Sequence, residues 1–277
     1  MRRSAVFAGK FYAGSKNELI SQIESCFKSE IGPGKLPDRD EIDELRRSLG
    51  LISPHAGYMF SGPVAAHGFL SLCSYGKPKR VVMLGPNHSG YGSELSVWPE
   101  GEWNTPLGDI KVDEELADEL IEGSGATLSG DTTAHLYEHC LEVQLPFLQY
   151  CFGNDFTIVP IVMTSQSKVA VERIVKALSS VVKEPGTLII ASSDLNHYED
   201  HETTIKKGKL LIEEIKNRNV DGLYATSKKN RITACGLGPI AVVISLYGEI
   251  EVLKHTTSAE ASGDSFHTVG YLSAIAK

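Results

Sequence analysis

Short apolar runs alternate along this chain with longer segments in which apolar residues recur every three or four positions. The short runs are rich in Val, Ile and Leu and therefore predict β-strands. The strands are expected at residues 49–53, 80–85, 94–98, 157–163, 187–192, 249–258 and 267–275. The longer segments predict amphipathic helices. These helices are expected at residues 16–29, 62–74, 113–123, 138–152, 166–182 and 201–217.

Two local features modify this pattern. Residues 31–41 are rich in Gly, Pro and charged side chains and predict a loop, followed by a short helix near 40–47. Pro146 falls inside the helix expected at 138–152, where its ring removes a backbone hydrogen bond and should kink the helix. Near-continuous apolar strands that alternate with helices predict a single α/β domain over residues 1–277. Its central sheet should be mostly parallel or mixed, with helices on both faces.

Composition narrows the class of protein without identifying an activity. Of the 277 residues, 42% are hydrophobic and 22% are charged, as in an ordinary soluble globular protein. The net charge of −8 argues against non-specific nucleic-acid binding, which depends on a basic surface. The apolar runs are too short to cross a membrane, and the N-terminus lacks the apolar core of a signal peptide. Five scattered cysteines without a CxxC pair predict a reduced, cytoplasmic protein.

Side chains that bind soft metal ions follow two of the expected strands and precede one apolar helix. His55 comes directly after the first strand, in ISPHAGY, and His88 after the second, in LGPNHSG. Cys235 lies in TACGLGPIAVV, where a Gly-rich turn leads into the helix. Ligands bind beyond the carboxyl ends of the strands in an open α/β sheet, so we expect these side chains to converge there. Two imidazoles and a thiolate favour Fe(II), Cu or Zn over Mg or Ca.

A third strand end adds groups that can move protons. The run IIASSDLNHYEDH (189–201) places Asp194 and His197 three residues apart, on a tight turn or at a helix start. A histidine held by a carboxylate beside a metal can act as a general acid or base, so we expect His197 and Asp194 to be catalytic. The alternative for Asp194 is to cap the helix that follows. A single histidine near a strand end is usually structural, but three polar clusters at equivalent sheet positions favour a shared site.

The position of Cys235 predicts a reactive thiol. If the helix begins near Gly236, the dipole and the free N–H groups at its N-terminus should lower the pKa of the thiol. The alternative is a buried cysteine that packs as a small apolar side chain. That alternative suits the other cysteines, Cys26, Cys73, Cys151 and, less clearly, Cys140.

Other polar residues receive structural interpretations. Glu138 and His139 open the helix expected at 138–152, where a carboxylate in the first turn complements the helix dipole, so capping is favoured over function. The basic run at 228–231 predicts a solvated loop, with attraction of an anionic substrate as the alternative. The remaining histidines are assigned structural roles, namely His67, His135, His201, His255 and His267.

Six strings, in chain order, resemble the Memo family. They are AGKFYAG (8–14), SPHAGYMFSGPVAA (53–66), GPNHSG (85–90), EHCLEVQLPFLQ (138–149), SSDLNHY (192–198) and ACGLGPI (234–240). The strings extend over nearly the whole chain, and together they are highly specific. The resemblance implies a fold similar to that of the class III non-haem iron extradiol dioxygenases.

Those dioxygenases bind Fe(II) with two His and one Glu and use a further His as acid or base. The resemblance places the corresponding Memo pocket, which has two His and a Cys, at His55, His88 and Cys235, with Asp194 and His197 beside it. A thiolate in place of the carboxylate alters the redox potential of iron and opens a route to copper binding, so dioxygenase activity does not follow from the fold. Family members are linked to metal-dependent oxidation and to reduced-copper binding, and the animal protein to phosphotyrosine peptides.

Three hypotheses follow. The first is a metal-dependent oxidoreductase, with Fe(II) or Cu at His55, His88 and Cys235 and a small-molecule substrate. The second is a non-catalytic module that binds a ligand or peptide, such as a phosphotyrosine adaptor, because the dioxygenase carboxylate is lost. The third is a zinc hydrolase, because two His, a Cys and a water also form a workable zinc site. The sequence leaves open the identity of the substrate or peptide and whether the protein forms a homo-oligomer.

Overall fold

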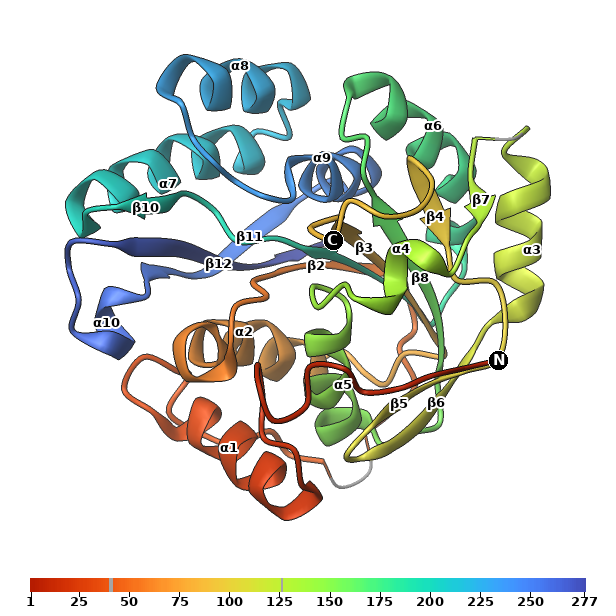
Figure 1. The fold of residues 1–277 in the computed structure, drawn as a ribbon, viewed down its shortest axis with the longest axis horizontal. Coiled ribbons are helices and arrows are strands. Elements are labelled where there is room, and N and C mark those ends of the chain that lie inside the picture. Colours follow the sequence, from red (N-terminus) through yellow and green to blue (C-terminus); the bar gives the residue numbers. More distant parts are fainter. Residues whose placement is uncertain (40–41, 126) are drawn as a thin grey trace.

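The computed structural model describes residues 1–39, 42–125 and 127–277. Within these residues the chain forms a mixed sheet of twelve strands with helices on both faces (Figure 1). The α/β class and the mixed sheet expected from the sequence are therefore confirmed. All the expected strands occur, as β2 (Leu49–Ser53), β3 (Arg80–Pro86), β4 (Leu95–Val97), β8 (Thr157–Met163), β9 (Thr187–Ser192), β11 (Ile250–Thr257) and β12 (Thr268–Ala276).

The sequence pattern missed several short strands. They are β1 (Arg2–Arg3), β5 (Glu102–Thr105), β6 (Gly108–Val112), β7 (Ser129–Gly130) and β10 (His197–Glu199). Strands β5 and β6 form an antiparallel hairpin in which buried and less buried positions alternate. Such short half-buried strands lack the continuous apolar run that marks the central strands.

Four central strands determine where the candidate site lies. Strands β8, β3, β9 and β2 are neighbours in that order and run parallel. Every residue of β2 and β9 is buried, as expected for parallel strands covered on both faces. The register aligns Ser53 of β2 with Ser192 of β9, and Pro86 of β3 with Met163 of β8. The carboxyl ends of the four strands therefore meet at one edge, and the loops that follow them lie together.

Two groups of helices cover the sheet (Figure 1). One face carries α1 (Lys16–Lys28), α2 (Tyr58–Cys73) and α5 (Leu145–Phe152). The other carries α6 (Lys168–Leu178), α7 (His201–Lys216), α8 (Val220–Asn230) and α9 (Leu237–Leu246). The peripheral helices are α3 (Glu114–Gly123), α4 (Thr133–Leu136) and α10 (Ala259–Ser262). Among the described residues, no helix has the length and apolar character that a membrane crossing requires.

The helix expected at 138–152 is wrong in its first half. The chain is irregular from Glu138 to Leu141, forms a 3₁₀ turn at Glu142–Gln144 and becomes α-helical only at Leu145. Pro146 therefore lies in the first turn of α5, where its missing N–H has no helical partner to lose, and it does not kink the helix. The irregular stretch frees Glu138 and its neighbours for contacts outside a helix.

Three further boundaries differ from the sequence pattern. The short helix expected near 40–47 begins on residues that lie outside the described ones, and residues 42–47 are not helical. Helix α2 begins at Tyr58, earlier than expected, because the Tyr58 N–H donates to the carbonyl of Phe11, a tertiary contact that periodicity cannot show. The basic run at 228–231 begins inside α8 rather than forming a solvated loop.

A buried ion pair fixes the N-terminal segment, which crosses the front of α5 in Figure 1. The Arg3 guanidinium lies over the ring of Trp103 and contacts a Glu142 carboxylate oxygen at 2.5 Å. Arg3 also donates to the backbone carbonyls of His135 and Glu138. The side chains of Arg3 and Glu142 are at most 1% exposed. Arg3 therefore ties β1 to the irregular segment that follows α4.

Candidate metal centre

Three of the expected site residues occupy equivalent places at the sheet edge. His55, His88 and Asp194 each lie two positions beyond the last residue of a strand, namely β2, β3 and β9. These strands are neighbours with aligned carboxyl ends, so the loops bring the three residues together.

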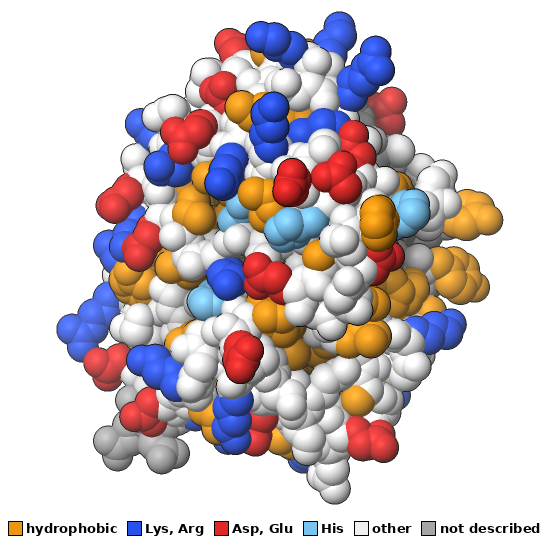
Figure 2. Space-filling model, turned by 90° about the vertical axis from the view of Figure 1, so that its left-hand side faces the viewer, with side chains coloured by type: hydrophobic (Ala, Val, Ile, Leu, Met, Phe, Trp, Pro, Cys, Tyr) orange, Lys and Arg blue, Asp and Glu red, His pale blue; other side chains and the backbone are white. Residues whose placement is uncertain are grey.

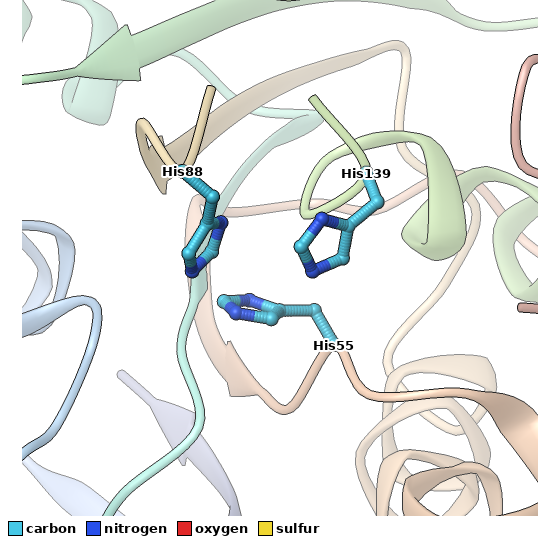
Figure 3. A group of neighbouring side chains, drawn as sticks. All are labelled: His55, His88 and His139. Atoms are coloured by element: carbon cyan, nitrogen blue, oxygen red, sulfur yellow. The ribbon is translucent and has the colours of Figure 1, made fainter. Parts of the chain in front are cut away.

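A third imidazole, that of His139, completes a cluster with His55 and His88. The ring centroids of His55 and His88 are 5.2 Å apart, and His139 lies 5.3 Å from the first and 4.7 Å from the second. Figure 3 shows the three rings gathered around a common space. One nitrogen from each ring lies within 4.8 Å of the others. Metal–nitrogen bonds are about 2.1 Å long, so small ring rotations would bring all three nitrogens onto one ion.

A hydrogen-bond chain defines which nitrogen of His55 is free. The Ser192 hydroxyl donates to the carbonyl of Cys140 at 2.6 Å and accepts an N–H from Gln144 at 2.8 Å. Gln144 also donates to the carbonyl of Pro54, which fixes its amide orientation. Since the one Ser192 proton is used, Ser192 accepts the Nδ1–H of His55 at 2.9 Å. The Nε2 of His55 therefore carries a lone pair and faces the cluster.

The buried carboxylate of Glu138 orients the other two imidazoles. One of its oxygens lies 3.0 Å from His88 Nδ1 and 3.3 Å from His139 Nδ1. Glu138 also accepts the backbone N–H groups of His88, at 2.5 Å, and Cys140, at 3.0 Å. A carboxylate on one ring nitrogen leaves the other nitrogen as the ligand atom, the arrangement common in metal-bound histidines. A Cβ at Gly85 would lie 2.4 Å from the Cys140 sulfur, so the close approach of this segment to β3 requires glycine.

The surroundings favour neutral imidazoles at His55 and His139 and an ionised carboxylate at Glu138, whereas they favour the protonated form of His88. Burial lowers the pKa of His55 to about 3 and that of His139 to about 4, and neighbouring imidazolium charge adds to both shifts. Burial opposes the ionisation of Glu138, but its hydrogen bond to His88 and the charges of His88 and His139 outweigh it and lower the pKa to about 2. Burial alone would lower the pKa of His88, yet the hydrogen bond and charge of Glu138 raise it.

Cys235 lies against His55 at the edge of this cluster. Its sulfur is 3.2 Å from His55 Nε2 and 3.2 Å from the backbone nitrogen of Asp194, which donates to it. Gly236 is the N-cap of α9, so the expected helix start is correct. The expected lowering of the thiol pKa is wrong, because burial raises the pKa of Cys235 and the Asp194 carboxylate raises it further. In this environment the thiol stays protonated unless a nearby positive charge stabilises the thiolate.

The loop that carries Cys235 is held from two sides. Gly236 donates its N–H to the Ser193 hydroxyl at 2.9 Å, and a Cβ at Gly236 would lie 2.6 Å from the Ser193 Cβ, so only glycine fits. The Gln166 side chain, from the loop after β8, donates to the Cys235 carbonyl and accepts the N–H of Gly238. The first turn of α9 is thus fixed against the edges of β8 and β9.

Asp194 supports His55 rather than capping a helix. Its Oδ1 accepts the backbone N–H of His55 at 2.8 Å, and its side chain is buried. Burial raises the pKa of Asp194, while the His55 N–H and three neighbouring imidazoles oppose that rise. Asp200 caps α7 instead, accepting the N–H of Thr203. The alternative that Asp194 is a helix cap is therefore wrong.

His197 lies outside the group of three imidazoles but close enough for its charge to act on His55 and Asp194. Thr233 holds it twice: the Thr233 hydroxyl accepts the His197 backbone N–H, and the Thr233 carbonyl lies 2.8 Å from Nδ1. A carbonyl can only accept, so Nδ1 carries the proton and Nε2 is free. The next residue, Tyr198, has a left-handed φ of 64° at an irregularity between β10 and β12. Such strain often marks functional positions.

The sequence reasoning missed two residues of the cluster. The capping role predicted for Glu138 and His139 is wrong, because both residues belong to the groups suited to a metal. A usable signal was Pro146: proline favours the first turn of a helix, which would have placed Glu138 and His139 before the helix. Ser192, Gln144 and Gln166 gave no signal, because their role depends on contacts across the fold.

The histidines expected to be structural stay outside the cluster. His135 lies 3.2 Å from the carbonyl of Ser96, and His67 lies 2.9 Å from the carbonyl of Ile31. His201 contacts the Thr257 hydroxyl. In the described part of the chain, the three-residue groups suited to a metal are His55, His88 and His139, and the overlapping set His88, Glu138 and Cys140.

Known proteins resemble this chain over its full length. The model of the family described as Memo-like protein matches residues 3–275. A MEMO1 family protein of Thermotoga neapolitana is 49% identical over 278 residues, covering 99% of both chains, and one of Sulfurisphaera tokodaii is 45% identical, covering 99% of this chain and 98% of its own. The crystal structure of an uncharacterized protein from Escherichia coli K12 superimposes with a TM-score of 0.59 at 14% identity, covering 83% of this chain and 100% of its own. At that identity the likeness shows the fold alone.

Proposed function

Because this chain belongs to the Memo family, and because three imidazoles and a thiol gather at its sheet edge, we propose that it is a metal-dependent oxidoreductase. The observation that carries the proposal is the group of three imidazoles facing one space, with Ser192 holding Nδ1 of His55 and Glu138 beside Nδ1 of both His88 and His139. This arrangement supports binding of a soft or borderline transition metal, Fe(II) or Cu, rather than Mg or Ca.

The donor chemistry suits such a metal. Low pKa values at His55 and His139 keep both rings neutral, so binding needs no proton release from them. Burial and the Asp194 carboxylate disfavour the Cys235 thiolate, and a cation beside His55 would stabilise it. The Glu138 carboxylate adds a fixed negative charge behind two of the rings. We propose His55, His88 and Cys235 as ligands, with His139 as a fourth donor.

When bound, Fe(II) or Cu would supply electron transfer and open positions for a small-molecule substrate. The chain's own residues then bind, orient and move protons. The Nε2 of His197 is free and would accept or return a substrate proton, with Thr233 holding the ring. Asp194 is buried with a raised pKa and holds the His55 loop through its backbone N–H. In this proposal His197 is the general acid–base group and Asp194 a positioning residue.

Anaerobic metal titration tests the proposal. Metal-free protein is mixed separately with Fe(II), Cu(I) and Zn(II), and binding is measured in the wild type and in His88→Ala, Cys235→Ser and His139→Gln. His67→Gln, on a histidine whose Nε2 lies 2.9 Å from the Ile31 carbonyl and outside the imidazole cluster, is the matched control. We expect binding to fall at least tenfold in His88→Ala and Cys235→Ser and to stay unchanged in the control. Undiminished binding in both ligand variants would overturn the assignment.

The same titration separates this function from the alternatives. Preference for Zn(II), with no oxygen uptake in the presence of a catechol, would favour a zinc hydrolase. No specific metal binding would favour a ligand-binding or adaptor module, which a phosphotyrosine peptide titration would examine. On the face drawn in Figure 2, Lys and Arg are interspersed with Asp and Glu rather than forming a continuous basic surface. That face therefore supports neither nucleic-acid binding nor a strongly anionic partner.

A further inference from the structure

Two cysteines far apart in sequence meet where helices α2 and α5 pack together, away from the candidate metal centre. Cys73 is the last residue of α2, and Cys151 is the penultimate residue of α5. Phe69 and Phe147, each four residues before one of these cysteines, stack with centroids 5.0 Å apart and planes within 4°. The two helices are therefore in close contact one turn before the thiols.

The thiols themselves form a pair. The two side chains are close enough to interact, because Cys73 is among the causes that, after burial, raise the pKa of Cys151. Cys26 and Cys140 instead donate to backbone carbonyls, those of Tyr58 and Pro86. Cys73 and Cys151 thus differ from the isolated buried cysteines that the sequence suggested.

The two members of the pair differ in access to solvent. Cys151 is 3% exposed, whereas Cys73 is half-buried. Cys73 also lines two surface cavities, each of about 520 Å³. Cys73 is therefore the member of the pair that a small solute would reach first, because Cys151 is buried. Burial raises the pKa of Cys151, and the Arg39 guanidinium, which donates to the carbonyl of Tyr150, opposes that rise.

We propose that Cys73 and Cys151 are a reversible redox site that closes to a disulfide when a hydroperoxide reaches Cys73. The Cys73 thiolate attacks the peroxide, the O–O bond breaks, and hydroxide leaves as water with the thiol proton. The resulting sulfenic acid at Cys73 is attacked by Cys151, the S–O bond breaks, and a second water leaves. Two thiols lose two electrons and two protons, and one hydrogen peroxide becomes two waters.

Closure of this bond would restrain the intervening chain, residues 74–150, which carries His88, Glu138 and His139. Restraining a loop of this length reduces the freedom of the unfolded chain and so raises thermal stability. The oxidised protein should unfold roughly 5–15 °C above the reduced protein. The disulfide would thus link α2 covalently to α5 under oxidising conditions.

Hydrogen peroxide treatment of the full-length, metal-free protein tests this proposal. We expect the intact mass to fall by two hydrogens, peptide mapping to link Cys73 to Cys151, and dithiothreitol to reverse both the link and the rise in melting temperature. Cys73→Ser and Cys151→Ser should abolish the link, whereas the matched control Cys26→Ser should retain it.

Mapping of the wild type keeps the test decisive even if a variant folds poorly. Stable sulfinic acid at Cys73 with Cys151 still free would overturn the proposal, and so would a link between other cysteines. These outcomes do not depend on the proposed metal function, because metal is absent from the experiment.

Discussion

Two buried glutamates, four residues apart, differ in the partners that stabilise their carboxylate charge. Glu142 is fully buried and faces a permanent cation, Arg3, while also accepting the N–H groups of Val6 and Phe7 and the hydroxyl of Tyr12. Glu138 is 1% exposed. Among the described residues its ion-pair partners are imidazoles, together with two backbone N–H groups.

The different partners give the two glutamates different roles: Glu142 stabilises the fold, and Glu138 orients the imidazoles of the candidate metal centre. A buried carboxylate matched by arginine keeps its partner at any physiological pH, so Glu142 fixes the N-terminal segment. A buried carboxylate matched by imidazoles leaves their outer nitrogens able to bind a metal, so Glu138 organises a site. Substitution should therefore affect stability at one residue and ligand binding at the other.

Replacing Arg3, the cation that pairs with Glu142, should have the largest effect on the free energy of unfolding. Arg3→Met leaves the Glu142 carboxylate buried without its cation and should lower the free energy of unfolding by about 3–5 kcal/mol. Chemical denaturation measures the loss. The double variant Arg3→Met/Glu142→Leu should recover part of it, because the unpaired charge is gone. A loss below 1 kcal/mol in the single variant would show that the pair does not anchor this segment.

Neutralising the carboxylate of Glu138 should act mainly on metal binding. Glu138→Gln keeps the shape but weakens the hold on His88 and His139, and metal affinity should fall about 10–100-fold. Metal titration measures this fall, with Glu142→Gln as the matched control that should change stability more than affinity. Equal effects on affinity from both variants would remove the distinction between the two residues.

Acidic pH should lower the free energy of unfolding, because His135 is buried and resists protonation in the folded protein. Burial lowers the pKa of His135 to about 3, with the Arg3 charge adding to the shift, and its Nδ1 has no hydrogen-bond partner among the described residues. The unfolded chain gains a proton below its pKa of about 6.5 while the folded chain does not, so stability is intact above 6.5 and declines as pH falls from there toward 3. The decline should be about 1 kcal/mol between pH 6.5 and 5.5 and should approach about 1.4 kcal/mol per pH unit below that.

Denaturation at several pH values, in the wild type and in His135→Gln, isolates this contribution. The variant should lack that part of the acid dependence, because glutamine does not titrate. An unchanged slope in His135→Gln would assign the acid sensitivity to other groups.

The smallest effect is expected at Thr233, which holds His197 by hydrogen bonds. Thr233→Val removes the hydroxyl that accepts the His197 backbone N–H and should lower stability by about 1 kcal/mol. Thr233→Ser keeps that hydroxyl and should be nearly neutral. Denaturation of the two variants side by side checks the difference, and a loss in Thr233→Ser as large as that in Thr233→Val would contradict the role of the hydroxyl.

The central fold was predictable because its strands are continuous apolar runs, as β2 and β9 show. His55, His88 and Asp194 could be found because each directly follows such a strand. Glu138 and His139 were harder to find, because the helical spacing of apolar residues in 138–152 masks an irregular segment that only Pro146 signals. The conformation of this segment is set by contacts with the loop after β3 and with the N-terminal segment. Propensity does not encode such long-range hydrogen bonds.

The central claim is that the imidazole cluster oriented by Glu138 is a metal centre. Anomalous diffraction from crystals grown with Fe(II) under anaerobic conditions tests it most directly. We predict one ion about 2.1 Å from nitrogens of both His55 and His88, with the Cys235 sulfur or a His139 nitrogen completing the set. An empty cluster at saturating Fe(II), or an ion bound elsewhere without His55 and His88, would contradict it.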